Sequence, residues 1–179
     1  MLGTIAALSR QAKTAFAAAS AEHLWPVVVR YAAAASLSGQ TVDTLRDGLD
    51  QTWRVAHGES EDVSRVASFA EASVPEEDEA LGPVSGYAQN AIAAIAYAAR
   101  TWTTDSAQEA VWSARQVYEA ADLAAHYAGD GRIHPDDSDV VHAALSLLHA
   151  DLEAASAGRL VELERQARAG ALEFAQLLK

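Results

Sequence analysis

Alanine dominates the stretch from residue 85 to residue 100, where it occupies seven of the sixteen positions. Alanine is the strongest intrinsic helix former, and β-branched residues are sparse outside short clusters such as residues 27–29. Larger apolar residues, including Ile92, Ile95 and Trp102, recur at intervals that place them on one helix face. The sequence therefore predicts an all-α protein, with a central helix that begins at Pro83.

The same periodicity predicts helices along the rest of the chain. Proline inside a helix costs about 3 kcal/mol, so we expect Pro26 to separate two helices near Trp25, the first with one buried stripe. Ser60 is the predicted N-cap of a later helix. Because no fixed-period repeat or linker divides residues 1–179, we expect a single-domain bundle of about seven to eight helices. The predicted helices cover residues 5–19, 26–37, 41–57, 60–70, 83–102, 104–127, 141–155 and 160–178.

Composition excludes several classes of site. The chain has 179 residues and no cysteine, which removes thiol catalysis, thiolate metal sites and disulfides and fits a cytoplasmic location. Its first residues lack the basic start of a signal peptide, and no apolar run is long enough to span a bilayer. We therefore expect a soluble cytoplasmic protein.

The formal net charge is −12, and the acidic residues are unevenly distributed. Residues 59–109 carry ten acidic and two basic residues, so this third alone has a net charge of −8. Such a field repels nucleic acids and anionic membranes, and we expect neither as a partner. A basic protein is the partner that this charge favours.

Two acidic clusters are the candidate partner-binding residues. The first is Glu59, Glu61 and Asp62, and the second is the run Glu76, Glu77, Asp78 and Glu79. Carboxylates on a loop can speed the encounter with a basic protein, but they can also simply favour the start of the following helix. Trp112 lies beside the apolar stripe of its helix and is the aromatic candidate for a partly exposed contact.

No catalytic residue, metal site or cofactor is predicted. Asp139, His142 and His149 line one face of a predicted helix, together with Ser146 and Glu153, but the two histidines stand two turns apart, about 10 Å, too far to share one ion unaided. His134 and Asp137 lie in the turn-rich stretch 129–138, where such residues are common. No nucleophile elbow, phosphate-binding loop or His-Glu-x-x-His motif occurs.

The order of several short motifs resembles the YjaG-like proteins, a bacterial all-helical family of unknown function. The matching stretches are residues 16–26 (FAAASAEHLWP), 51–54 (QTWR), 74–78 (VPEED), 88–95 (AQNAIAAI) and 172–178 (LEFAQLL). This resemblance implies a helical fold and no known catalytic residues. In size, helicity and acidity the chain is also similar to the helical immunity proteins that bind the toxins of polymorphic toxin systems.

Three hypotheses about function follow. The first is a non-enzymatic protein-binding module, an immunity-type inhibitor that presents its acidic surface to a basic partner such as a cognate toxin. The second is a self-associating helical module, possible as a homodimer. The third is a metal- or ligand-dependent enzyme whose residues come together from distant helices.

Overall fold

The computed structural model describes residues 2–35, 37–76, 79–128 and 139–178. Within these residues the chain forms eight α-helices and one short 3₁₀ helix and no strand, so the prediction of an all-α bundle of seven to eight helices is confirmed. The elements are α1 (Leu2–Ala6), α2 (Arg10–Ala35), α3 (Gly39–Ala56), α4 (Ser64–Ala72), η1 (Glu79–Leu81), α5 (Pro83–Thr104), α6 (Ala107–Ala128), α7 (Asp139–Ser156) and α8 (Leu160–Leu177).

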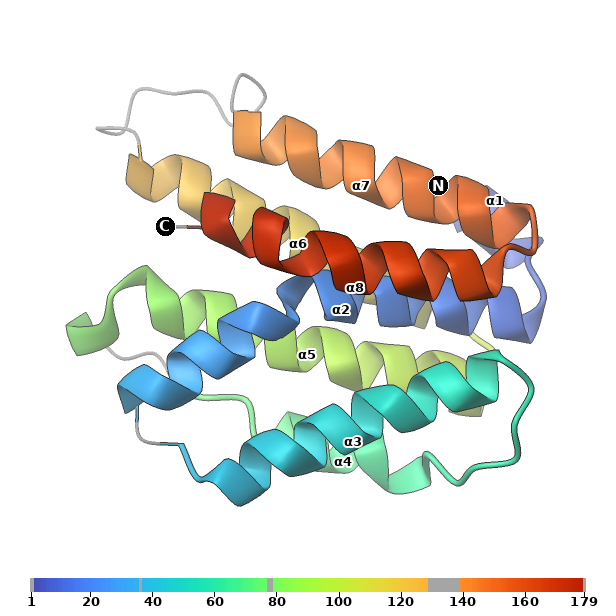
Figure 1. Ribbon diagram of the computed structural model, residues 1–179, viewed down its shortest axis with the longest axis horizontal. Helices are drawn as coiled ribbons and strands as arrows, with labels where there is room; N and C mark the ends of the chain where they lie inside the picture. Colours follow the sequence, from blue (N-terminus) through green and yellow to red (C-terminus); the bar gives the residue numbers. More distant parts are fainter. Residues whose placement is uncertain (1, 36, 77–78, 129–138, 179) are drawn as a thin grey trace.

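The helix α2 runs through the middle of the bundle (Figure 1). Every residue from Ala12 to Leu24 is buried, and α2 contacts α3, α5, α6, α7 and α8. Small side chains make this possible, because alanine lets neighbouring helices approach closely on all sides. The prediction of one buried stripe in this segment was therefore wrong, since a helix surrounded by others buries its whole circumference.

Pro26 lies inside α2, so the predicted boundary between two helices at this position is also wrong. Proline removes one backbone hydrogen bond and bends a helix, and Figure 1 shows that α2 changes direction in its second half. Leu24, Val27 and Val28 are fully buried on both sides of the proline. Packing against the neighbouring helices therefore keeps α2 helical despite the local cost of the proline.

The predicted start of α5 at Pro83 is confirmed. A hydroxyl group of α6 links α5 to α2. The Oγ of Ser113 on α6 lies 2.8 Å from the carbonyl oxygen of Ala17 on α2 and 3.1 Å from that of Ala94 on α5. One buried hydroxyl thus joins three helices. A methyl group at Gly86 would lie 2.8 Å from Leu123 Cδ2, so the lack of a side chain there permits the contact between α5 and α6.

The helices α3 and α4 pack together along one side of the bundle, below α5 in Figure 1, while α6, α7 and α8 lie above. The start of α4 differs from the prediction, because α4 begins at Ser64 and Ser60 does not cap it. The backbone N–H of Ser64 instead donates to Asp62 Oδ1 at 2.9 Å. None of the helices in the described residues has the length and apolar character needed to cross a membrane.

Candidate functional site

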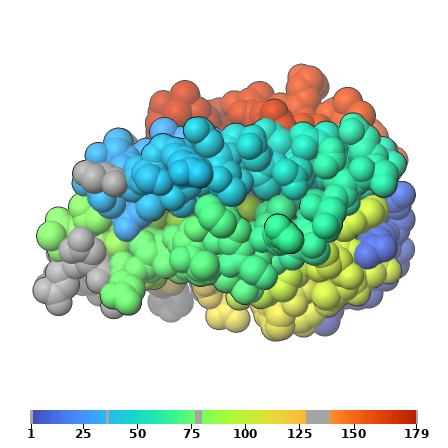
Figure 2. All heavy atoms as spheres, turned by 90° about the horizontal axis from the view of Figure 1, so that it is seen from below, coloured from blue at the N-terminus to red at the C-terminus, as the bar shows by residue number. Residues whose placement is uncertain are grey.

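An acidic stretch of the chain forms α3 and α4, which run side by side in Figure 2. Residues 39–76 contain eight carboxylate side chains and three arginines, a net charge of −5. Apart from Asp62, which is hydrogen-bonded to Ser64, four exposed carboxylates of this stretch make no ion pair with any described residue: Asp43, Asp47, Glu59 and Glu76. We call these four residues the acidic face.

The predicted cluster at residues 59–62 divides into residues with different roles. Glu59 is exposed and belongs to the acidic face. Glu61 Oε1 accepts from Arg54 Nε at 3.0 Å, so its charge is partly neutralised. The hydrogen bonds that Asp62 accepts from the side chain and the backbone of Ser64 lower the pKa of its carboxyl group, which stays charged at the start of α4. Asp62 therefore stabilises the start of α4.

The second predicted cluster is only partly described. Glu76 is exposed, whereas Glu77 and Asp78 lie outside the described residues, and Glu79 begins η1. Asp43 and Asp47 were not among the predicted site residues. Their spacing of four on α3, opposite the buried Leu45 and Leu49, is the signal that could have identified them.

Trp112 is 38% exposed on α6. Its ring lies 5.7 Å from that of Tyr97 on α5, and the guanidinium of Arg100 lies 4.7 Å from the centre of the Tyr97 ring. Arg100 in turn pairs with Glu71 of α4 and with Glu109 of α6. Trp112 is thus connected to α4 through Tyr97 and Arg100.

A cluster of charged side chains that the sequence did not predict lies between α2, α3 and α8. At its centre is Glu22, which is 4% exposed. Its two carboxylate oxygens accept from Arg46 Nη1 and Nη2 at 2.9 and 3.0 Å, and Trp53 Nε1 donates to it at 3.1 Å. A buried carboxylate is therefore satisfied by two residues of the neighbouring helix.

The cluster continues from Arg46 to α8. Asp50 Oδ1 accepts from Arg46 at 2.7 Å and from Arg168 at 2.8 Å. Arg168 also pairs with Glu164, whose Oε2 lies 2.6 Å from Nε2 of His57. Burial by itself would lower the pKa of Arg46, but its hydrogen bonds with Glu22 and Asp50 outweigh burial and raise that pKa. Because each charge has a partner of opposite sign, this cluster is suited to holding α2, α3 and α8 together.

A second buried polar pair joins α2 to α7. His23, which is 1% exposed, has its Nε2 2.8 Å from Oδ2 of Asp151. The predicted polar stripe lies elsewhere on α7, because Asp139, His142 and His149 are all exposed, and His149 lies 3.4 Å from Glu153. Within the described residues, no group of three or more His, Asp or Glu side chains could hold a metal ion. His134 and Asp137 lie outside the described residues.

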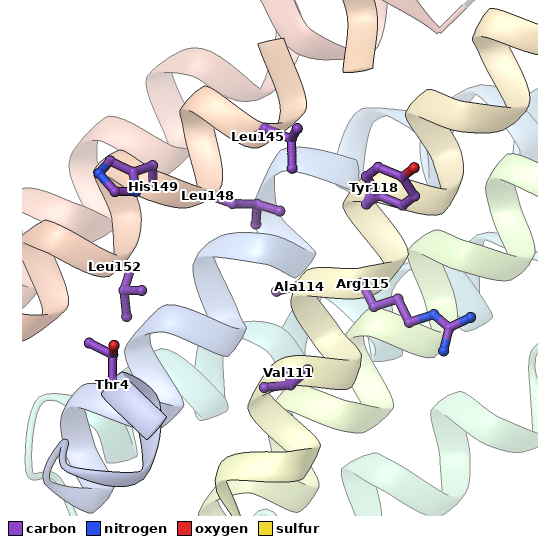
Figure 3. A pocket seen from close by; sticks show the side chains of 9 residues that line it. All are labelled: Thr4, Val111, Ala114, Arg115, Tyr118, Leu145, Leu148, His149 and Leu152. Atoms are coloured by element: carbon purple, nitrogen blue, oxygen red, sulfur yellow. The ribbon is translucent and has the colours of Figure 1, made fainter. Parts of the chain in front are cut away.

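A groove of about 600 Å³ separates α6 from α7 and is closed at one end by Thr4 of α1 (Figure 3). Its walls are mainly aliphatic and include Val111, Leu148 and Leu152. Arg115 and His149 lie at its rim and pair with Glu119 and Glu153 of their own helices. The groove therefore lacks an unpaired charge directed at its centre.

Comparison with known proteins identifies a fold but no function. No protein-family model matches this sequence, and no curated protein matches it. A solved structure of a DUF416 family protein from Shewanella baltica OS155 superposes with a TM-score of 0.79 and 15% sequence identity, covering 93% of this chain and 92% of that chain. This similarity does not confirm the YjaG-like name and gives no support to the resemblance to immunity proteins. The chain thus shares its fold with a member of an uncharacterised helical family.

Proposed function

We propose that this chain is a non-enzymatic protein-binding module that uses its acidic face to bind a basic protein. The observation that carries the proposal is the set of four exposed carboxylates, Asp43, Asp47, Glu59 and Glu76, that make no ion pair with described residues. Unpaired charges of one sign on one surface attract an oppositely charged partner and speed its association.

Neighbouring side chains add to this surface. Phe69 of α4 is 37% exposed, and the partly exposed Trp112 is connected to Glu71 of α4 through Tyr97 and Arg100. Aromatic side chains supply much of the affinity at protein interfaces, whereas charges at the rim mainly set the association rate. We therefore expect Trp112 to affect the dissociation rate and the acidic face to affect the association rate.

In its narrower form, the proposal is that the chain is an immunity-type inhibitor and that the basic partner is a toxin. The net charge of −12 suits the inhibition of a basic nuclease, because the inhibitor would occupy the surface that attracts nucleic acid. The partner should then stop growth when it is expressed alone and be harmless when it is expressed together with this chain. A captured partner without toxicity would remove the narrower form and leave protein binding in place.

The test compares two variants with equal charge changes. The face variant combines Asp43→Asn, Asp47→Asn and Glu59→Gln, and the control variant combines Asp139→Asn, Glu153→Gln and Glu173→Gln on α7 and α8. Each variant removes three exposed negative charges. A basic protein captured from the native host by the wild-type chain should associate about tenfold more slowly with the face variant at low ionic strength, and the control should lose much less.

Interferometry at several salt concentrations provides the association rates. The difference between wild type and face variant should shrink as salt rises, because screening weakens charge attraction. Equal rates for the face variant and the wild type at low salt would contradict the proposal. Recovery of nothing but further copies of this chain would also contradict it, and would favour self-association instead.

A further inference from the structure

Arg30 lies in the second half of α2, four residues after Pro26. It is half-buried, and its guanidinium carbon lies 5.8 Å from the centre of the Tyr87 ring on α5. The bend of α2 carries this part of the helix away from α8 (Figure 1). Arg30 therefore lies in the part of α2 that follows the bend.

The guanidinium of Arg30 has two buried nitrogens, Nε and Nη2, without a hydrogen-bond acceptor among the described residues. Arg30 also makes no ion pair with a residue that the structure describes. Other bases that are largely covered by protein do have carboxylate partners: Lys13 pairs with Asp105, Arg46 with Glu22 and Arg100 with Glu109. In a chain with 25 acidic and 13 basic residues, a half-buried arginine without a carboxylate partner in the described part of the chain requires an explanation.

The two unsatisfied nitrogens have a specific chemical meaning. Nε and Nη2 form one edge of the planar guanidinium, and their N–H bonds point in the same direction. This edge is the fork that binds both oxygens of a carboxylate or a phosphate at once. Leaving a buried charged donor unpaired is costly, so an anion bound to this edge would gain a strong, shielded interaction.

Tyr87 does not supply the missing negative charge. Burial raises the pKa of its hydroxyl group, and although the charge of Arg30 acts in the opposite direction, the net effect is a higher pKa. The phenol is therefore neutral at physiological pH, and its ring offers Arg30 a contact with its π-electrons only.

We propose that the Nε–Nη2 edge of Arg30 binds an oxyanion that presents two oxygens, a carboxylate or a phosphate group, between α2 and α5. The site is distinct from the acidic face and does not depend on the function proposed above. Because both nitrogens are closed to solvent, binding requires the groups that cover them to move aside. Equilibrium measurements are therefore the appropriate test.

Thermal unfolding in three salts tests the proposal. The wild type, Arg30→Met, Arg30→Lys and the control Arg165→Met are compared in sodium chloride, sodium phosphate and sodium acetate at the same ionic strength and pH 7. Arg165 is an exposed arginine on α8. We expect phosphate or acetate to raise the unfolding midpoint of the wild type and the control by about 2–4 °C at several times the dissociation constant.

The Arg30 variants distinguish two cases. In the first, the arginine binds an anion, and in the second, its guanidinium is partly covered by protein but binds no ligand. Arg30→Met should lose the rise and should unfold at a higher temperature than the wild type in chloride, because it removes two buried nitrogens that have no acceptor among the described residues. Arg30→Lys keeps the charge but lacks the planar fork, so the anion should raise its unfolding midpoint by less than that of the wild type. The Nε–H resonance of Arg30 should shift in a saturable way with the effective anion.

The outcomes are distinguishable. A rise with phosphate alone identifies a phosphate group as the ligand, and a rise with acetate identifies a carboxylate. No rise in the wild type, an equal rise in Arg30→Met, or an unchanged Nε–H resonance during the titration would overturn the proposal.

Discussion

Glu22 shows what a single buried charge does in this bundle. Its carboxylate, on the central helix α2, accepts hydrogen bonds from Arg46 and Trp53 of α3. Nε of Arg168 on α8 lies 4.0 Å from Oε2 of Glu22. A buried carboxylate without partners would be strongly unfavourable, so these contacts are possible in only one arrangement of the three helices. The residue thus selects the alignment of α3 and α8 along α2.

Replacing Glu22 with glutamine should reveal this role. Glu22→Gln leaves Arg46 with Asp50 as its remaining carboxylate and should lower the free energy of unfolding by about 2–4 kcal/mol. The matched control is Glu61→Gln, which breaks the more exposed pair with Arg54 and should cost less than about 1 kcal/mol. Urea denaturation measures both variants. Equal small losses would show that the charge cluster does not hold the helices.

At the scale of helices, the approach of α3 to α4 depends on Gly48. A methyl group at this position would lie 2.8 Å from Cγ1 of Val66 on α4. Because valine is branched at Cβ, its methyl groups cannot move aside without shifting the helix. The short helix α4 therefore lies as close to α3 as the missing side chain allows.

Gly48→Ala should destabilise the protein, although alanine is the better helix former. The clash should outweigh the propensity gain and leave a net loss of about 1–2 kcal/mol. Gly170→Ala on α8 is the control, since no atom lies within 4 Å of its new methyl group and it should gain up to about 1 kcal/mol. Adding Val66→Ala to Gly48→Ala should recover part of the loss. A stabilising Gly48→Ala would contradict this account of the packing.

At the scale of the whole molecule, charge is distributed unequally. The chain has a net charge of −12, and the acidic face places four carboxylates without an ion pair to described residues on α3 and in the segments that follow α3 and α4. Like charges on a compact surface repel one another, and this repulsion opposes folding until salt screens it. The same feature that we propose for partner binding should therefore be visible in stability.

Raising sodium chloride from 0.02 to 0.2 M should increase the unfolding midpoint of the wild type, because the Debye length falls to below about 10 Å. The variant with Asp43→Asn, Asp47→Asn and Glu59→Gln should start from a higher midpoint at low salt and gain less from added salt. The control with Asp139→Asn, Glu153→Gln and Glu173→Gln should resemble the wild type more closely. Calorimetry measures the midpoints, and identical salt responses of the two variants would contradict a concentrated acidic face.

The amino-acid sequence by itself determined the helical class and most helix positions. The start of α5 at Pro83 and the end of α7 before Gly158, whose φ is +70°, follow from residues that act on their own backbone. The tertiary structure decided the points where packing overrides local preference. Pro26 remains inside α2 because its neighbours are buried, and Asp62 replaces Ser60 at the start of α4.

The candidate functional residues also fall into two groups, those that the sequence could indicate and those that only the tertiary structure reveals. Glu59 and Glu76 could be recognised from the sequence because acidic runs are local, and the spacing of Asp43 and Asp47 on α3 also lies within one helix. The cluster around Glu22 could not be predicted, because its members from Glu22 to Arg168 come from three helices. Arg30 looks like an ordinary helix residue in the sequence. Only the packing of α2 against α5 buries its fork and leaves it without an acceptor in the described part of the chain.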